Sequence, residues 1–145
     1  MVFVRKDSTE QALNYKLLFF KRNLKLREAA GFWDFPGGKV EVQDYQESYQ
    51  KAFAKLAEKF SQYHDFDKRA ACIRECLEET NILISDKQTF QPAISGDFAE
   101  WLNQVGVEPA FDKLYAHFRI GPPFGFYPSI DTMFYLCFED STHSA

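Results

Sequence analysis

The sequence lacks the features of a membrane span or an extended fibre. Its 145 residues hold no apolar run near the ~20 residues that cross a bilayer, so we expect no membrane-spanning helix. There is no internal repeat or low-complexity segment, and 46% hydrophobic with 26% charged residues is an ordinary globular composition. Disorder, collagen and coiled coil are therefore excluded, and one domain is expected.

Basic residues are fewer than acidic ones, and the sequence has three cysteines. Lys and Arg number 17 against 21 Asp and Glu, which argues against general nucleic-acid binding, because such proteins are usually basic. A small phosphorylated ligand stays compatible with this balance. The three cysteines lack CxxC spacing, and Arg5, Lys6 and Asp7 interrupt any signal peptide. We therefore expect an intracellular, reducing compartment, and leave a mitochondrial or peroxisomal location open without a targeting signal to support it.

Aromatic residues, by contrast, are abundant, with 16 Phe and 7 Tyr, which predicts an aromatic core. Extended segments are predicted where short apolar runs stand between turn residues, at 2–4, 15–22, 39–42, 113–120 and 132–138. The run in 15–22 suits a strand covered on both faces. Helices are predicted at 45–62, 68–80 and 97–104, the second with Asp65 or Asp67 as its cap. This order predicts an α/β fold.

The first of these helices carries an aromatic stripe. Aromatic and leucine side chains recur there at steps of three and four, at Tyr45, Tyr49, Phe53, Leu56, Phe60 and Tyr63. Packing is the commoner role of such a face, and a ligand box the rarer one. The sequence leaves open whether the stripe packs on its own domain or on a protein partner.

The helix at 68–80 carries three carboxylates on one side. At 100° per residue, Glu75, Glu78 and Glu79 fall within about a 100° arc. Like charges at these spacings destabilise an exposed helix by about 0.2–0.5 kcal/mol per pair, and a divalent cation would reverse that sign. Such oxygen donors suit Mg²⁺ or Mn²⁺. A solvated acidic face is the alternative interpretation.

Upstream, residues 35–41 read Phe-Pro-Gly-Gly-Lys-Val-Glu, and a glycine pair lets backbone approach a ligand closely. Together with the acidic helix, this segment resembles the Nudix hydrolase box. That box runs Gly, five residues, Glu, seven residues, Arg-Glu-aliphatic-x-Glu-Glu-x-Gly-aliphatic. The matching residues are Gly38, Arg74, Glu75, Glu78, Glu79 and Ile82.

The departures from the box are specific. Asp44 stands in the place of its first Glu, Cys76 replaces an aliphatic residue, and Asn81 replaces the last Gly. Asn is the next-best residue for a left-handed helix end, so we expect the turn to survive. The spacing differs most, because 29 residues separate Asp44 from Arg74 where the box has seven. The extra 22 residues contain the aromatic helix.

The insertion is similar to that of a Nudix branch with coenzyme A and acyl-CoA diphosphatase activity. The Pro-rich turn at Gly121 and the Asp131-Thr132 strand also resemble that branch. The resemblance implies hydrolysis of a nucleoside diphosphate linked to another moiety, with CoA or acyl-CoA as the favoured small-molecule substrate. Its adenine or pantetheine arm would lie against Trp33 or the inserted helix. The alternative is a non-catalytic Nudix-fold structural or binding subunit of a larger assembly.

The family also implies roles for the matching residues. Glu75, Glu78 and Glu79 would hold Mg²⁺ or Mn²⁺, with Glu75, Glu78 and Arg74 as the catalytic set, in which Arg74 orients a carboxylate. Gly37, Gly38 and Lys39 would supply backbone near the metal or phosphate. Glu100, Glu108 and Glu139 are unranked candidates for a general base.

The resemblance further implies an α/β/α sandwich with a mixed sheet, in one domain over residues 1–145. Nudix domains usually continue past the last strand into a further strand and a helix. Either residues 83–111 supply that layer or the domain is shortened at its C-terminal side. In the second case, a protein partner would bind at that side or at the aromatic helix of residues 45–63.

Overall fold

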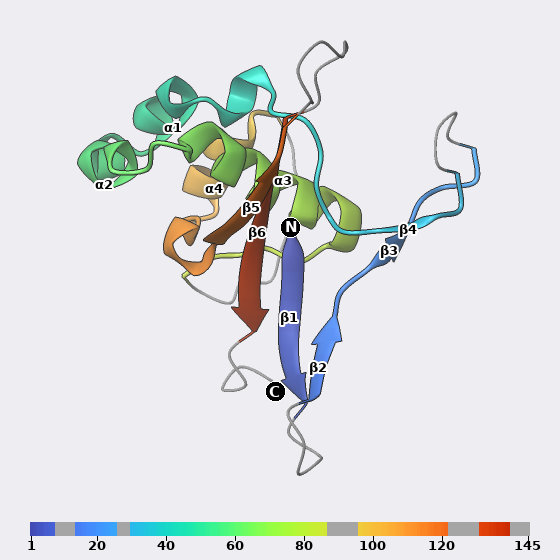
Figure 1. The fold of residues 1–145 in the computed structure, drawn as a ribbon. Helices are drawn as coiled ribbons and strands as arrows, with labels where there is room; N and C mark the ends of the chain where they lie inside the picture. Colours follow the sequence, from blue (N-terminus) through green and yellow to red (C-terminus); the bar gives the residue numbers. More distant parts are fainter. Residues whose placement is uncertain (8–13, 26–29, 87–95, 122–130, 140–145) are drawn as a thin grey trace. The chain divides into compact units, whose positions relative to one another are not determined.

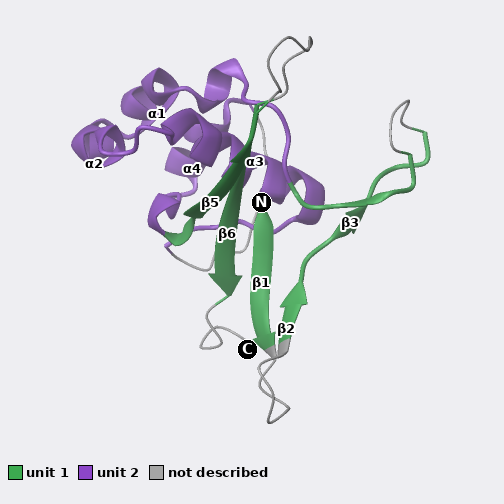
Figure 2. Cartoon of the chain, in the orientation of Figure 1, with its two compact units in different colours: residues 1–36, 113–145 green, residues 37–112 purple. Residues whose placement is uncertain are grey.

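The computed structural model describes residues 1–7, 14–25, 30–86, 96–121 and 131–139. The chain divides into two compact units, one of residues 1–36 and 113–145 and the other of residues 37–112 (Figure 2). The named strands lie in the first unit and the α-helices in the second. The α/β class predicted from the sequence is therefore confirmed, and the single-domain organisation stays a prediction.

The first unit is built on a mixed four-stranded sheet of order β2-β1-β6-β5 (Figure 1). Its strands are β1 (Val2–Asp7), β2 (Asn14–Leu17), β5 (Tyr115–Ile120) and β6 (Thr132–Glu139). β1 pairs parallel with β6, whereas β1 with β2 and β5 with β6 are antiparallel. The N-terminal strand β1 thus lies beside β6, the last strand among the described residues, and the mixed sheet is confirmed.

Two predicted strands are corrected. The segment 15–22 is not one covered strand, because β2 ends at Leu17 and a separate hairpin follows, in which β3 (Phe20–Lys21) pairs with β4 (Trp33–Asp34). Leu17 and Phe19 are 47% and 42% exposed. Segment 39–42 forms no strand, because residues 42–44 turn into the 3-10 helix η1 (Val42–Asp44).

The predicted helix at 45–62 is broken in two. α1 (Gln46–Ala52) ends at Phe53, whose φ of −124° and ψ of 55° are not helical. A 3-10 turn, η2 (Ala54–Leu56), then leads into α2 (Ala57–Ser61). In a straight helix, residues 49 and 60 would lie about 16 Å apart along the axis. The break instead brings the Tyr49 and Phe60 rings to a centroid distance of 6.1 Å.

These rings form the aromatic core of the second unit. Its buried members are Tyr49, Phe53, Phe60, Phe66 and Phe111. Most neighbouring pairs meet edge-on or tilted, the closest being Phe66 and Phe111 at 4.9 Å, which is the favoured aromatic geometry. The predicted aromatic core is confirmed. These five rings pack on one another within the unit, whereas a protein partner at the segment 45–63 stays a prediction.

α3 (Phe66–Thr80) is the predicted acidic helix, and it begins two residues earlier than expected. Asp65 occupies the cap position, but its side chain pairs with Arg69 at 2.7 Å instead of capping the helix. The predicted apolar side is buried, as at Ile73, Cys76 and Leu77. Asn81 ends the helix in the left-handed conformation, with φ of 59° and ψ of 25°, as expected for the residue in place of the box glycine.

The last helix of the second unit is α4 (Phe98–Gln104). Its cap is Asp97, whose side chain accepts hydrogen bonds from the amides of Ala99 and Glu100. Within the parts of the chain that the structure describes, no helix is both long and apolar enough to cross a membrane.

Candidate functional site

Arg74 is the centre of a polar network inside the second unit. Its side chain is 2% exposed, and its Nε and Nη2 donate to the two carboxylate oxygens of Asp44, each at 2.9 Å. Nη2 also donates to the Lys39 carbonyl oxygen at 3.0 Å. Burial disfavours the charged guanidinium, but the hydrogen bonds and charge of Asp44 outweigh it, so the pKa of Arg74 is raised. The arginine is a fixed cation.

A short turn places the Asp44 carboxylate beside this arginine. The Asp44 side chain is fully buried and accepts a hydrogen bond from the Glu41 amide at 2.8 Å. The Asp44 amide in turn donates to the Glu41 carbonyl oxygen at 3.0 Å. These bonds close η1 and orient the Asp44 carboxylate toward Arg74, which binds it with two parallel hydrogen bonds.

Arg74 also contacts two of the three carboxylates on α3. Its Nη1 donates to Glu78 at 3.0 Å, and its Nη2 lies 3.2 Å from Glu75. The pKa of Glu75 is raised by burial, and repulsion from Glu78 and Glu79 adds to this while Arg74 opposes it. One guanidinium thus holds three carboxylates, those of Asp44, Glu75 and Glu78.

The glycine pair lies against the same side of α3. The Gly37 amide donates to Glu79 at 2.9 Å, and Gly37 has a φ of +155°, a conformation that side chains disfavour. At Gly38 a Cβ would stand 2.1 Å from the Glu75 carboxylate oxygen. The two positions therefore favour glycine for different reasons. Gly37 permits the backbone conformation, and Gly38 leaves room for the Glu75 carboxylate.

The network brings together most of the predicted site. Arg74, Glu75 and Glu78 share direct contacts, Gly37 and Gly38 meet Glu79 and Glu75, and Lys39 takes part through its carbonyl oxygen. The candidate bases lie in other ion pairs. Glu100 pairs with Lys51 at 3.4 Å, Glu108 with Lys59 at 3.3 Å, and Glu139 with Arg5.

Whether this site suits a metal ion depends on its donors. Within residues 1–7, 14–25, 30–86, 96–121 and 131–139, no three or more His, Cys, Asp or Glu side chains are grouped so as to hold one. Arg74 and the Gly37 amide engage the carboxylates instead. The donors themselves fit Mg²⁺ or Mn²⁺, because they are carboxylate oxygens. Burial raises the pKa of Glu75, and repulsion from Glu78 and Glu79 adds to this rise.

Sequence reasoning missed the pairing of Arg74 with Asp44. The signal was present, since Asp44 occupies the place of a box carboxylate and Arg74 was expected to orient some carboxylate. The 29 intervening residues hid the contact, because nothing local in the sequence indicates that the two ends of the insertion meet.

Comparison of the sequence with models of protein families and with curated proteins finds no match. The structure is similar to a crystal structure of a NUDIX hydrolase from Alicyclobacillus acidocaldarius, with a TM-score of 0.69 and 21% sequence identity. The match covers 95% of this chain and 67% of that one. At this level of identity the likeness establishes the fold, and the chain has the mixed α/β fold of a Nudix protein.

Proposed function

We propose that the chain is a metal-dependent Nudix pyrophosphohydrolase that cleaves a nucleoside diphosphate linked to another moiety. The observation that carries this is the network in which Arg74 holds Asp44, Glu75 and Glu78 while the Gly37 amide meets Glu79. The buried Arg74 orients Glu75 and Glu78 on one face of α3. An acidic helix face that only contacts solvent does not need a buried arginine to orient its side chains. The fold neighbour, itself a hydrolase, supports the proposal.

The residues of this network divide the work. Glu75, Glu78 and Glu79 would hold Mg²⁺ or Mn²⁺, which when bound supplies charge neutralisation for a diphosphate and a water of lowered pKa. Arg74 is a positioning residue: it is 2% exposed and touches carboxylates. Gly38 keeps the loop against Glu75 without a side chain in the way. The carboxylates of the site are thus oriented before a substrate binds.

For the substrate we propose CoA or an acyl-CoA. The support is the similarity of the 22-residue insertion, the Pro-rich turn and the Asp131-Thr132 strand to the CoA diphosphatase branch. Cleavage would give a 4′-phosphopantetheine fragment and adenosine 3′,5′-bisphosphate. Nucleoside diphosphate sugars, dinucleoside polyphosphates and capped RNA are the rival substrates for the same fold.

The test measures metal binding and hydrolysis together. Glu78→Gln and Glu79→Gln keep the side-chain shape and remove a charge, so Mn²⁺ affinity measured by calorimetry should fall at least tenfold, and Mg²⁺-dependent release of adenosine 3′,5′-bisphosphate should be lost. Glu58→Gln on α2, another exposed helical glutamate, is the matched control and should change neither. Turnover of ADP-ribose without CoA would reject the branch and keep the reaction class.

One observation favours a second function. Arg74 and the Gly37 amide already engage the carboxylates of Glu75, Glu78 and Glu79. Among the described residues no three acidic, His or Cys side chains are grouped so as to hold a metal ion. Both features fit a Nudix-fold subunit that has a structural or binding role. Stable copurification with a larger assembly, without Mn²⁺ binding or turnover of any diphosphate, would establish this alternative.

A further inference from the structure

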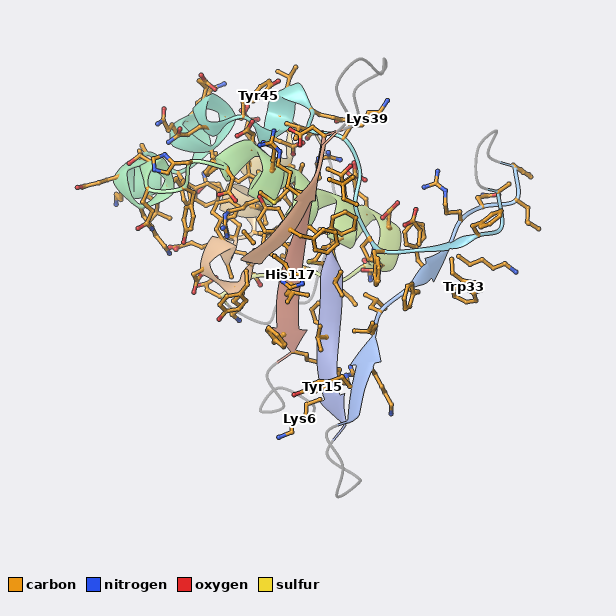
Figure 3. All side chains as sticks on the ribbon, viewed as in Figure 1. Lys6, Tyr15, Trp33, Lys39, Tyr45 and His117 are labelled. Atoms are coloured by element: carbon orange, nitrogen blue, oxygen red, sulfur yellow. The ribbon has the colours of Figure 1, made fainter. Side chains whose placement is uncertain are left out.

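An apolar cavity of about 490 Å³ lies in the first unit, outside the network of Arg74. Leu17, Phe19 and Trp33 line it, from the end of β2, the link to β3 and the strand β4. Leu17 and Phe19 are a little under half exposed, and Trp33 is 66% exposed. Figure 3 labels Trp33 on the β3–β4 hairpin. The three side chains form a contiguous exposed apolar patch, and such patches are typical of binding surfaces.

We propose that this cavity binds the base of an adenosine 3′,5′-bisphosphate group by stacking on Trp33, with Lys21 beside it to receive a phosphate. This inference deepens the proposed function and rests on it for the identity of the nucleotide. The lining residues that the structure describes carry no charge, so the cavity favours a flat, uncharged ring over a phosphate.

The hairpin supplies both the ring and the charge. Lys21 stands directly opposite Trp33 in the β3–β4 register, so the two side chains leave the same face of the hairpin. Phe19, two residues before Lys21, follows the same alternation. Its ring stacks on Phe35 with centroids 4.4 Å apart, which fixes the wall of the cavity. An aromatic platform with one lysine at its edge is complementary to a base that carries a phosphate.

The other aromatic candidates are less accessible or lie outside the cavity. The sequence placed the adenine or pantetheine arm either on Trp33 or on the inserted helix. On that segment Tyr49 and Phe60 are fully buried, whereas Tyr45 is 45% exposed. Trp33 is more exposed than Tyr45, at 66%, and of these two rings it is the one among the described residues that line the cavity.

The test uses adenosine 3′,5′-bisphosphate and adenosine 5′-monophosphate without metal, so that neither hydrolysis nor metal binding contributes. Both should quench the tryptophan emission saturably. The change reports on Trp33, because the second tryptophan, Trp101, is buried. Calorimetry on Trp33→Leu should show at least tenfold weaker binding of both. Phe32→Leu changes the neighbouring ring, 69% exposed on the other face of the hairpin, and should bind like the wild type.

Lys21→Ala tests the phosphate separately. It should weaken the binding of the bisphosphate severalfold and leave the affinity for the monophosphate unchanged. Lys6→Ala on β1 should change neither affinity. Equal affinity of Trp33→Leu and wild type would overturn the stacking site, and equal losses for both nucleotides in Lys21→Ala would overturn the role of the lysine. If the wild type hydrolyses CoA but binds no nucleotide through Trp33, this inference fails while the proposed function stands.

Discussion

At the scale of single residues, two kinds of ion pair coexist in this chain. Arg74 and Asp44 are 2% and 0% exposed, whereas Lys51 and Glu100 are 80% and 50% exposed. Water competes for the second pair and screens it, so it contributes little. The first pair has no such competitor, and each partner depends on the other to offset the cost of burying a charge.

Asp44→Asn should therefore be strongly destabilising although it keeps the shape of the side chain. Arg74 would remain buried with one of its partners neutral, and we expect the free energy of unfolding to fall by about 3–5 kcal/mol, measured by urea denaturation. Lys51→Gln is the matched control and should cost less than about 1 kcal/mol. Similar small losses in both variants would show that the buried pair is not needed for stability.

Gly38→Ala tests the contact between the loop and α3. A Cβ would stand 2.1 Å from the Glu75 carboxylate, so this side chain must move away, and Mn²⁺ affinity measured by calorimetry should fall at least tenfold. A Cβ added at Gly121 would meet none of the described atoms within 4 Å, and Gly121→Ala should leave metal binding unchanged. Equal metal affinity in both variants would contradict a role of Glu75 as a ligand.

At the scale of elements, the sequence predicted best what is local. α3 and α4 were predicted within two residues because periodicity, caps and the left-handed Asn81 act over a few neighbours. The break at Phe53 was missed because it serves ring contacts between α1, α2 and the distant Phe111. The motif likewise gave the acidic side chains of the site, but not the pairing of Arg74 with Asp44, which depends on the tertiary fold.

Asn81 makes the end of α3 testable. Its φ of 59° strains any residue with a Cβ, and Gly is the residue that adopts this conformation without cost. Asn81→Gly should hold or raise the free energy of unfolding by up to about 1 kcal/mol, and Asn81→Ala should lower it by about 1 kcal/mol. Thermal unfolding measures both, and an Ala variant as stable as the Gly variant would refute the strain.

At the scale of the whole molecule, the core of the second unit buries groups that ionise in base. The thiols of Cys72 and Cys76 and the hydroxyl of Tyr49 are buried, and none of the three cysteines forms a disulfide. In the part of the chain that the structure describes, the Tyr49 hydroxyl has no hydrogen-bond partner. Burial raises the pKa of Cys72 from 9.0 to about 12, and it also raises the pKa of Cys76 and of Tyr49.

These shifts predict alkaline destabilisation. Above about pH 9 the unfolded chain loses the Cys72 proton while the folded chain keeps it until about pH 12. The unfolded state then binds fewer protons, so stability falls as pH rises through this window, by up to about 4 kcal/mol for this group. Urea denaturation at pH 7, 9, 10 and 11 should show the fall, with the part due to Tyr49 beginning near its ordinary value of 10.0.

Two variants separate these groups from the other residues that titrate in base. Cys72→Ala removes one ionising group and should flatten the decline above pH 9, whatever it costs at pH 7. Tyr49→Phe keeps the ring in the aromatic core and removes a hydroxyl that has no partner among the described residues. It should be at least as stable as the wild type at pH 7 and decline less above pH 10. Parallel declines in the wild type and both variants would mean that these groups ionise as readily in the folded chain as in the unfolded one.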